Sequence, residues 1–179
     1  MEKLSIGIIL GSTRPGRVSP QVGNWVKEVA DQRGDAHYEV VDLVDFKLPF
    51  VGEEGDQEQI HAWSAKLASL DGFVFIVQEY NHSITGVLKN ALDSARGEWN
   101  NKAAGIVSYG STGGARAAEH LRGILGELHI ADVRDHPTFS IFTDFENFNT
   151  FKPAKLHLEV VQSMLDQTVA WSGALKTVR

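Results

Sequence analysis

Short apolar runs of strand length alternate along this chain with stretches in which apolar residues recur at helical spacing. Four of these runs are almost continuously apolar, as strands buried on both faces of a sheet are, and a weaker run follows them. We predict strands at residues 4–10, 38–43, 72–77, 103–108 and, from the weaker run, around 131–141. Such alternation is typical of α/β proteins with a doubly wound parallel sheet. No internal repeat or linker divides the pattern, so we expect a single domain over residues 1–179.

Helical faces fill the intervals between the predicted strands. The first runs from Val22 to Ala30 with apolar residues at i, i+3, i+4, i+7 and i+8, and Gly34 supplies its C-terminal stop. Similar faces predict helices within residues 60–70, 87–95, 121–128 and 160–168. In doubly wound sheets, ligands bind in the crevice outside the carboxyl ends of the strands. The loops after the first, third and fourth strands are therefore the candidate site.

Composition and charge exclude several classes of protein. The chain carries 17 Lys and Arg against 23 Asp and Glu, and its basic residues do not cluster, so we expect no nucleic-acid partner. The absence of Cys excludes disulfide frameworks and thiolate catalysis and fits a reducing cytoplasm. No His spacing suggests a metal site. Because the longest unbroken apolar run covers only residues 73–77, we expect a cytoplasmic protein without a membrane segment.

The loop after the first strand, residues 11–19, combines glycines, hydroxyls and two arginines at the entry to a helix. Ser19 suits the N-cap position and Pro20 the first helical position. A helix N-terminus next to guanidinium groups favours binding of a phosphate; the alternative is a turn that only caps the helix. Arg17 and Val18 stand where a P-loop requires Lys and Ser/Thr, and no GxGxxG follows the strand. A mononucleotide or another phosphate monoester therefore fits better than a nucleoside triphosphate or a dinucleotide.

Two further loops carry polar and aromatic groups. Residues 78–83 (QEYNHS) supply an aromatic face, an amide, an imidazole and a hydroxyl that suit a planar heterocycle. The alternative is a polar turn that caps the next helix through Ser83 or Thr85. Residues 109–116 (YGSTGGAR) form a glycine-rich turn that allows close approach of a ligand. Because Thr112 stands where a hydrolase nucleophile elbow requires Ser, we do not expect hydrolysis.

In order and spacing, three segments together resemble the flavodoxin-like NADPH-dependent FMN reductase family, which includes quinone, azo-dye and chromate reductases. They are GSTRPGR at 11–17, EYNHSITGVLKNALD at 79–93 and SYGSTGGAR at 108–116. Leu48-Pro49 also resembles a turn of that family. The resemblance implies a five-stranded parallel sheet of order 2-1-3-4-5 with helices on both faces. It further implies FMN as cofactor, NADPH or NADH as reductant, and a homodimer or homotetramer.

The resemblance also assigns the residues that bind the cofactor. The phosphate ligands are Ser12, Arg14, Arg17, Val18 and Ser19. The residues that border the isoalloxazine ring are Glu79, Tyr80, Asn81, His82 and Ser83, with Tyr109 and Gly110 at its opposite end. Gln78 and Thr85 stand where the family usually has proline, so the rigidity that proline would give is missing. The Gln78 amide either bonds the edge of the ring or points to solvent.

The function implied is that of an FMN-dependent NAD(P)H oxidoreductase. NAD(P)H would deliver hydride to flavin N5, and a quinone, azo compound, metal oxyanion or free flavin would then take two electrons in a ping-pong cycle. Because the chemistry belongs to the cofactor, we expect no catalytic side chain and a small molecule as partner. Two alternatives stay open: a flavodoxin-type electron carrier that does not react with NAD(P)H, and a regulatory protein that kept the fold and lost flavin.

Five phenylalanines recur at every third position in one polar segment. They are Phe139, Phe142, Phe145, Phe148 and Phe151. This period is closer to an irregular or 3₁₀-like chain than to an α-helix. Either the rings anchor a long loop onto the core, or they form an exposed surface for a second subunit or a wall of the acceptor pocket.

Overall fold

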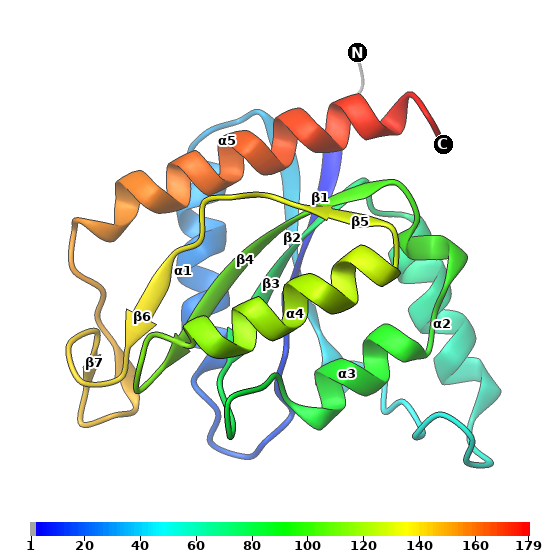
Figure 1. Ribbon diagram of the computed structural model, residues 1–179, viewed down its shortest axis with the longest axis horizontal. Helices are drawn as coiled ribbons and strands as arrows, with labels where there is room; N and C mark the ends of the chain where they lie inside the picture. Colours follow the sequence, from blue (N-terminus) through cyan, green and yellow to red (C-terminus); the bar gives the residue numbers. More distant parts are fainter. Residues whose placement is uncertain (1–2) are drawn as a thin grey trace.

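A parallel β-sheet forms the centre of the computed structural model, which describes residues 3–179 (Figure 1). Its strands lie in the order β2-β1-β3-β4-β5, and β6 also pairs with β4. The strands are β1 (Leu4–Leu10), β2 (Ala36–Asp42), β3 (Gly72–Gln78), β4 (Lys102–Gly110), β5 (Ile130–Asp132) and β6 (Thr138–Ser140). Both central strands, β3 and β4, are buried along their whole length. The predicted flavodoxin-like strand order is confirmed.

The last predicted strand, around residues 131–141, is wrong in detail because the structure divides it in two. β5 pairs with the start of β4 and β6 pairs with its end. Between them the chain leaves the ladder, where Pro137 has no N–H to donate. Backbone bonds still join this connection to β4, from Val133 N to Ala104 O at 2.9 Å and from Ser108 N to Pro137 O at 3.0 Å.

Helices cover both faces of the sheet (Figure 1). One face carries α1 (Ser19–Asp31) and α5 (His157–Lys176), and the other carries α2 (Gln57–Ala68), α3 (Gly86–Asp93) and α4 (Ala115–Glu127). Short 3₁₀ turns η1 (Leu43–Asp45) and η2 (Gly97–Trp99) and a hairpin of β7 (Phe145–Glu146) and β8 (Thr150–Phe151) complete the fold. Each predicted helical face overlaps one of the five α-helices, although Leu70, Ala95 and Leu128 lie just beyond the ends of α2, α3 and α4. Within residues 3–179, none of the helices combines the length and apolarity that crossing a membrane requires.

The core on the face of α2, α3 and α4 is built around two tryptophans. Trp63 and Trp99 are fully buried with ring centroids 6.0 Å apart. Burial of a large apolar side chain contributes about 1.5–3 kcal/mol. Their ring nitrogens donate to backbone carbonyls of α3, Trp63 Nε1 to Ala91 O at 2.8 Å and Trp99 Nε1 to Leu92 O at 3.1 Å. These contacts hold α3, the helix that follows the second candidate loop.

The register of the sheet brings the candidate loops together. Leu10 of β1 lies beside Ile76 of β3, and Val77 of β3 beside Ser108 of β4. The loops after β1, β3, β4 and β6 therefore leave the same edge of the sheet, at the bottom of Figure 1. This is the edge at which ligands bind in doubly wound folds.

Candidate functional site

The first loop presents an uncapped helix N-terminus. Arg14 and Arg17 are joined in a tight turn, with Arg17 N donating to Arg14 O at 3.1 Å, and Gly16 adopts a φ of 70°. The predicted N-cap is wrong by one residue, because α1 begins at Ser19 and its N-cap is Val18, which has no side-chain hydrogen bond to offer. The helix has no acidic residue in its first turn. Its N-terminus therefore keeps its partial positive charge for an anion.

Two buried polar atoms of this loop have no hydrogen-bond partner among the described residues. They are Arg17 Nε and Ser19 Oγ. The other end of the Arg17 guanidinium pairs with Asp42, at the end of β2, which fixes its position. A buried polar group without a partner costs free energy, and a phosphate oxygen would supply the missing acceptor for both. The loop thus fits the phosphate that its sequence suggested.

The second loop is a tight turn from Tyr80 to Ser83. Each of these two residues donates its N–H to the carbonyl of the other at 3.0 Å. The central residues Asn81 and His82 have φ values of 49° and 69°, the pattern of a type I′ turn, in which Asn is favoured. Tyr80 is 41% exposed and the Arg14 guanidinium lies 5.9 Å from its ring centroid. The structure therefore brings the predicted phosphate and ring loops together.

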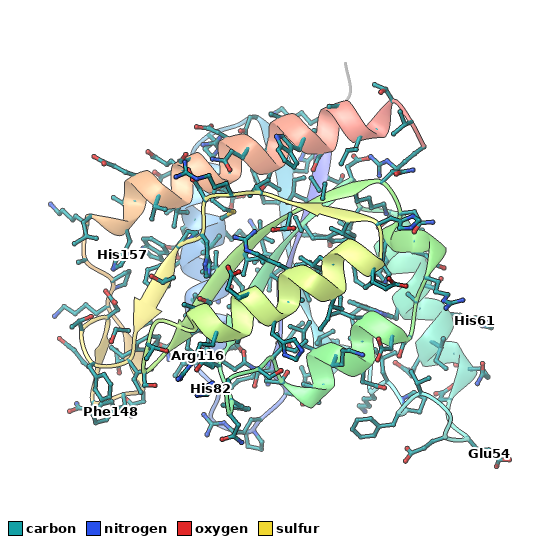
Figure 2. All side chains as sticks on the ribbon, in the orientation of Figure 1. Glu54, His61, His82, Arg116, Phe148 and His157 are labelled. Atoms are coloured by element: carbon teal, nitrogen blue, oxygen red, sulfur yellow. The ribbon has the colours of Figure 1, made fainter. Side chains whose placement is uncertain are left out.

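Glu79 joins the second loop to the third. Its side chain is 4% exposed and pairs with Arg116 of α4, whose Nε donates to Glu79 Oε1 at 2.5 Å and whose backbone N donates to Oε2 at 3.2 Å. Burial alone would raise the pKa of Glu79, but the bond and charge of Arg116 outweigh it and lower that pKa. Arg116 Nη1 also lies 2.8 Å from His82 Nε2, and Figure 2 shows the two side chains together. Sequence reasoning missed Arg116 as a site residue, although it closes the glycine-rich loop.

Gln78 and Tyr109 lie beneath the loops rather than on their surface. Gln78 does not point to solvent: it is 3% exposed, and its Nε2 donates to Gly11 O at 2.6 Å. Tyr109 is 6% exposed, and its hydroxyl donates to Gln78 Oε1 at 3.5 Å. Burial raises the pKa of the Tyr109 hydroxyl, so it stays protonated. Gly110 is packed closely, since an added Cβ would lie 3.2 Å from the Cβ of Glu79.

Thr85 confirms the alternative of a helix cap for the end of the second loop. It is the N-cap of α3, and its Oγ1 accepts from Leu88 N at 3.1 Å. Ser83 does not cap that helix; its Oγ lies 2.7 Å from Nδ1 of His120 in α4. The second loop is thus anchored to α3 at one position and contacts α4 at another.

The aromatic segment divides between the two alternatives. Phe139 and Phe145 are buried, and Phe145 lies 5.7 Å from the Tyr109 ring, so these rings anchor the segment. Phe142 and Phe148 are each 64% exposed and contact one another edge to face at 5.9 Å. Figure 2 shows Phe148 at the same edge as His82 and Arg116. The segment contains β6 and the β7–β8 hairpin rather than 3₁₀ structure.

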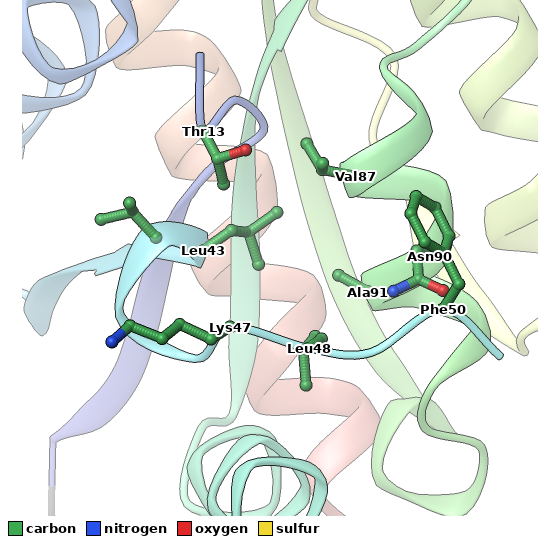
Figure 3. Close-up of a pocket in the computed structure, with 9 residues that line it drawn as sticks. Thr13, Leu43, Lys47, Leu48, Phe50, Val87, Asn90 and Ala91 are labelled. Carbon is green, nitrogen blue, oxygen red and sulfur yellow. The ribbon is translucent and has the colours of Figure 1, made fainter. Parts of the chain in front are cut away.

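A pocket of about 260 Å³ adjoins the first loop at Thr13. Its wall is mainly apolar and comes from the turn after β2 and from α3, including Leu43, Leu48, Phe50 and Val87 (Figure 3). Leu48 of the Leu48-Pro49 turn lines this pocket, which the sequence does not predict. It provides apolar surface beside the phosphate loop.

Known proteins resemble this chain in sequence and in fold. The family described as NADPH-dependent FMN reductase matches residues 4–144. A NAD(P)H-dependent FMN reductase of Schizosaccharomyces pombe is 37% identical over 177 residues, covering 94% of this chain and 82% of that protein. A quinone reductase of Escherichia coli is 32% identical over 146 residues, covering 77% of each. The structure of FerB, a flavoenzyme NAD(P)H:(acceptor) oxidoreductase from Paracoccus denitrificans, shares the fold with a TM-score of 0.74, 20% identity and coverage of 96% and 98%.

Proposed function

The chain belongs to the NADPH-dependent FMN reductase family, and from that premise we propose that it oxidises NAD(P)H and passes two electrons to a quinone. It is an oxidoreductase, with FMN as cofactor and a nicotinamide nucleotide as reductant. The quinone as acceptor is supported by the Escherichia coli relative, whose name gives that substrate. Azo compounds, metal oxyanions and free flavin are the other acceptors predicted from the sequence.

The structural observation that supports FMN binding in this proposal is the pair of unpartnered buried atoms in the first loop, Arg17 Nε and Ser19 Oγ. They lie at the uncapped N-terminus of α1, so donors, positive charge and helix dipole gather at one point. Ser12, Arg14 and Val18 complete the loop proposed to hold the FMN phosphate. An electron carrier would share this phosphate site, and only its reaction with NAD(P)H distinguishes the enzyme from it.

When bound, FMN supplies a centre that takes hydride at N5 from NAD(P)H and later gives two electrons to the acceptor. The protein's part is to bind and orient. Tyr80 offers an exposed aromatic face next to the phosphate loop, and the I′ turn presents Asn81 and His82 at its tip. The pair of Glu79 and Arg116 fixes this turn against α4. We propose that Ser83 and Gly110 complete the border of the ring.

Initial-rate kinetics test the reaction. We expect FMN-loaded protein to oxidise one equivalent of NADPH by itself and to continue turnover only when 1,4-benzoquinone or another acceptor is present. Double-reciprocal plots at several quinone concentrations should be parallel, because the first product leaves before the acceptor binds. Intersecting lines would refute the ping-pong order while leaving the oxidoreductase intact. Absence of any NADPH oxidation would refute the proposed function itself.

We further propose that residues 1–179 act as one FMN-binding domain. Cytoplasmic location and assembly as a homodimer or homotetramer stay predictions from the sequence. The exposed pair Phe142 and Phe148 is a surface that a second subunit could cover. Sizing chromatography of the double variant with both residues changed to Ala tests that assembly, since loss of the larger species would support it.

A further inference from the structure

The carbonyl oxygen of Gly11, where β1 passes into the first loop, accepts two side-chain hydrogen bonds at once. Gln78 Nε2 and Thr85 Oγ1 each donate to it at 2.6 Å. Both side chains are buried, with exposures of 3% and 6%. The Gly11 N–H in turn donates to Ile76 O of β3 at 3.0 Å. Both lone pairs of the carbonyl are therefore used, and the Gly11–Ser12 peptide is held in one orientation.

The orientation of this peptide determines where the next N–H points. In a planar trans peptide the C=O of one residue and the N–H of the next point in opposite directions. The Gly11 carbonyl is held toward β3, so the Ser12 N–H faces away from β3, toward the side on which β2 lies. At the end of β2, Asp42 holds the guanidinium of Arg17. Among the described residues, the Ser12 N–H donates to no backbone carbonyl.

We infer that Gln78 and Thr85 are positioning residues for the flavin phosphate: their hydrogen bonds to Gly11 O turn the Ser12 N–H toward the anion. A peptide in the opposite orientation would place a carbonyl oxygen against the phosphate and repel it. The inference rests on the proposed function only in taking the phosphate of FMN as the anion. It also gives a role to the two positions at which the chain lacks the proline usual in the family.

The positioning network extends to the third loop. The Tyr109 hydroxyl donates to Gln78 Oε1, while Gln78 Nε2 donates to Gly11 O, so one buried amide joins all three loops. Thr85 plays a second part, because its Oγ1 also accepts from Leu88 N and caps α3. Loss of the Thr85 hydroxyl therefore removes both the bond to Gly11 O and the cap, whereas loss of the Gln78 amide leaves the cap intact.

Three variants and two flavins test the inference. Gln78→Met keeps the size of the side chain but loses the donor, Thr85→Val loses the hydroxyl, and Thr85→Ser retains it. Gln167→Met is the matched control, because Gln167 lies in α5 and outside the three loops. Its Oε1 accepts one backbone hydrogen bond, from Asp135 N at 3.1 Å. Dissociation constants are measured by quenching of flavin fluorescence for FMN and for riboflavin, which lacks the phosphate. Circular dichroism checks that each variant is folded.

We expect Gln78→Met and Thr85→Val each to weaken FMN binding about tenfold. In each variant the Ser12 N–H would no longer be held toward the phosphate, and loss of one hydrogen bond to a charged group has an effect of that size. Riboflavin affinity should stay within about twofold, and Thr85→Ser and Gln167→Met should bind FMN as the wild type does. In the apo-protein, titration with inorganic phosphate should shift the Ser12 amide resonance in wild type and much less in Gln78→Met.

Three results would overturn the inference, and the third would refute the phosphate site as well. Unchanged FMN affinity in both donor-loss variants, or an equal loss of FMN and riboflavin, would refute the positioning role alone. Wild-type protein that binds riboflavin as tightly as FMN would refute the phosphate site, and the positioning role with it. Because Gln78 does not cap a helix, failure of Thr85→Val to fold would leave Gln78→Met to decide.

Discussion

Replacement of Ser19 by Ala should stabilise the apo-protein while weakening its flavin binding. Ser19 Oγ is fully buried in the first loop and has no partner. An unpaired buried hydroxyl costs about 1–3 kcal/mol, so its removal should raise the free energy of unfolding by about 1 kcal/mol. For a chain of this length that corresponds to a rise in Tm of about 2–4 °C. Loss of a donor to the phosphate should weaken FMN about tenfold.

Ser172 offers a matched control for this prediction. Its Oγ is also buried and unpartnered, but it lies in α5, where it packs against Gly72 at the opposite end of β3. Ser172→Ala should therefore raise stability in the same way and leave FMN affinity unchanged. Urea unfolding of both apo-variants and FMN titrations measure the two effects. The reasoning is refuted when Ser19→Ala destabilises the apo-protein, or when the two variants bind FMN equally well.

Other substitutions test the electrostatics and packing around the site. Arg116→Met should cost about 2 kcal/mol of unfolding free energy because it leaves the buried carboxylate of Glu79 without its cation, whereas Glu79→Gln should cost about 1 kcal/mol or less. Equal losses in urea unfolding would contradict this asymmetry. Burial lowers the pKa of His136 to about 4 from an ordinary value of 6.5. His136 is neutral in the folded protein and takes a proton more readily when unfolded, so stability should fall as pH decreases from 7 toward 4. His136→Gln should lose about 2 kcal/mol less than wild type over that range, and parallel pH profiles would count against the assignment. Gly123→Ala, in α4 with nothing near the added Cβ, should gain about 0.5–1 kcal/mol. Gly105→Ala should lose about 1–3 kcal/mol because its Cβ would lie 2.1 Å from the sulfur of a buried methionine; calorimetry showing the same sign for both would refute the packing argument.

The sequence predicts most helices and strands of this fold because two local patterns identify them, namely apolar runs and helical periodicity. Apolar runs mark β1, β3 and β4, and helical periodicity marks all five α-helices. The weakest prediction, one strand around residues 131–141, is wrong because polar residues separate two short strands there and Pro137 interrupts the ladder. The N-cap of α1 is missed by one residue because Ser19 already belongs to the helix and its buried hydroxyl bonds none of the N–H groups of the first turn.

The sequence motifs predict which loops form the candidate site, but they do not predict which residues those loops contact. The three loops are identified from their residues, yet the partners that fix them are distant in sequence. Asp42 pairs with Arg17 across 25 positions and Arg116 with Glu79 across 37. The orientation of Gln78 depends on a carbonyl 67 positions away. Such pairs depend on strand order and register, so no local pattern could identify them.

The most direct test of the account is an anaerobic visible spectrum of the protein loaded with FMN and filtered to remove free flavin. The account predicts that flavin is retained, that one equivalent of NADPH bleaches its oxidised absorbance in a single two-electron step, and that added benzoquinone restores it. Retained flavin that excess NADPH leaves oxidised would contradict the account and identify an electron carrier instead.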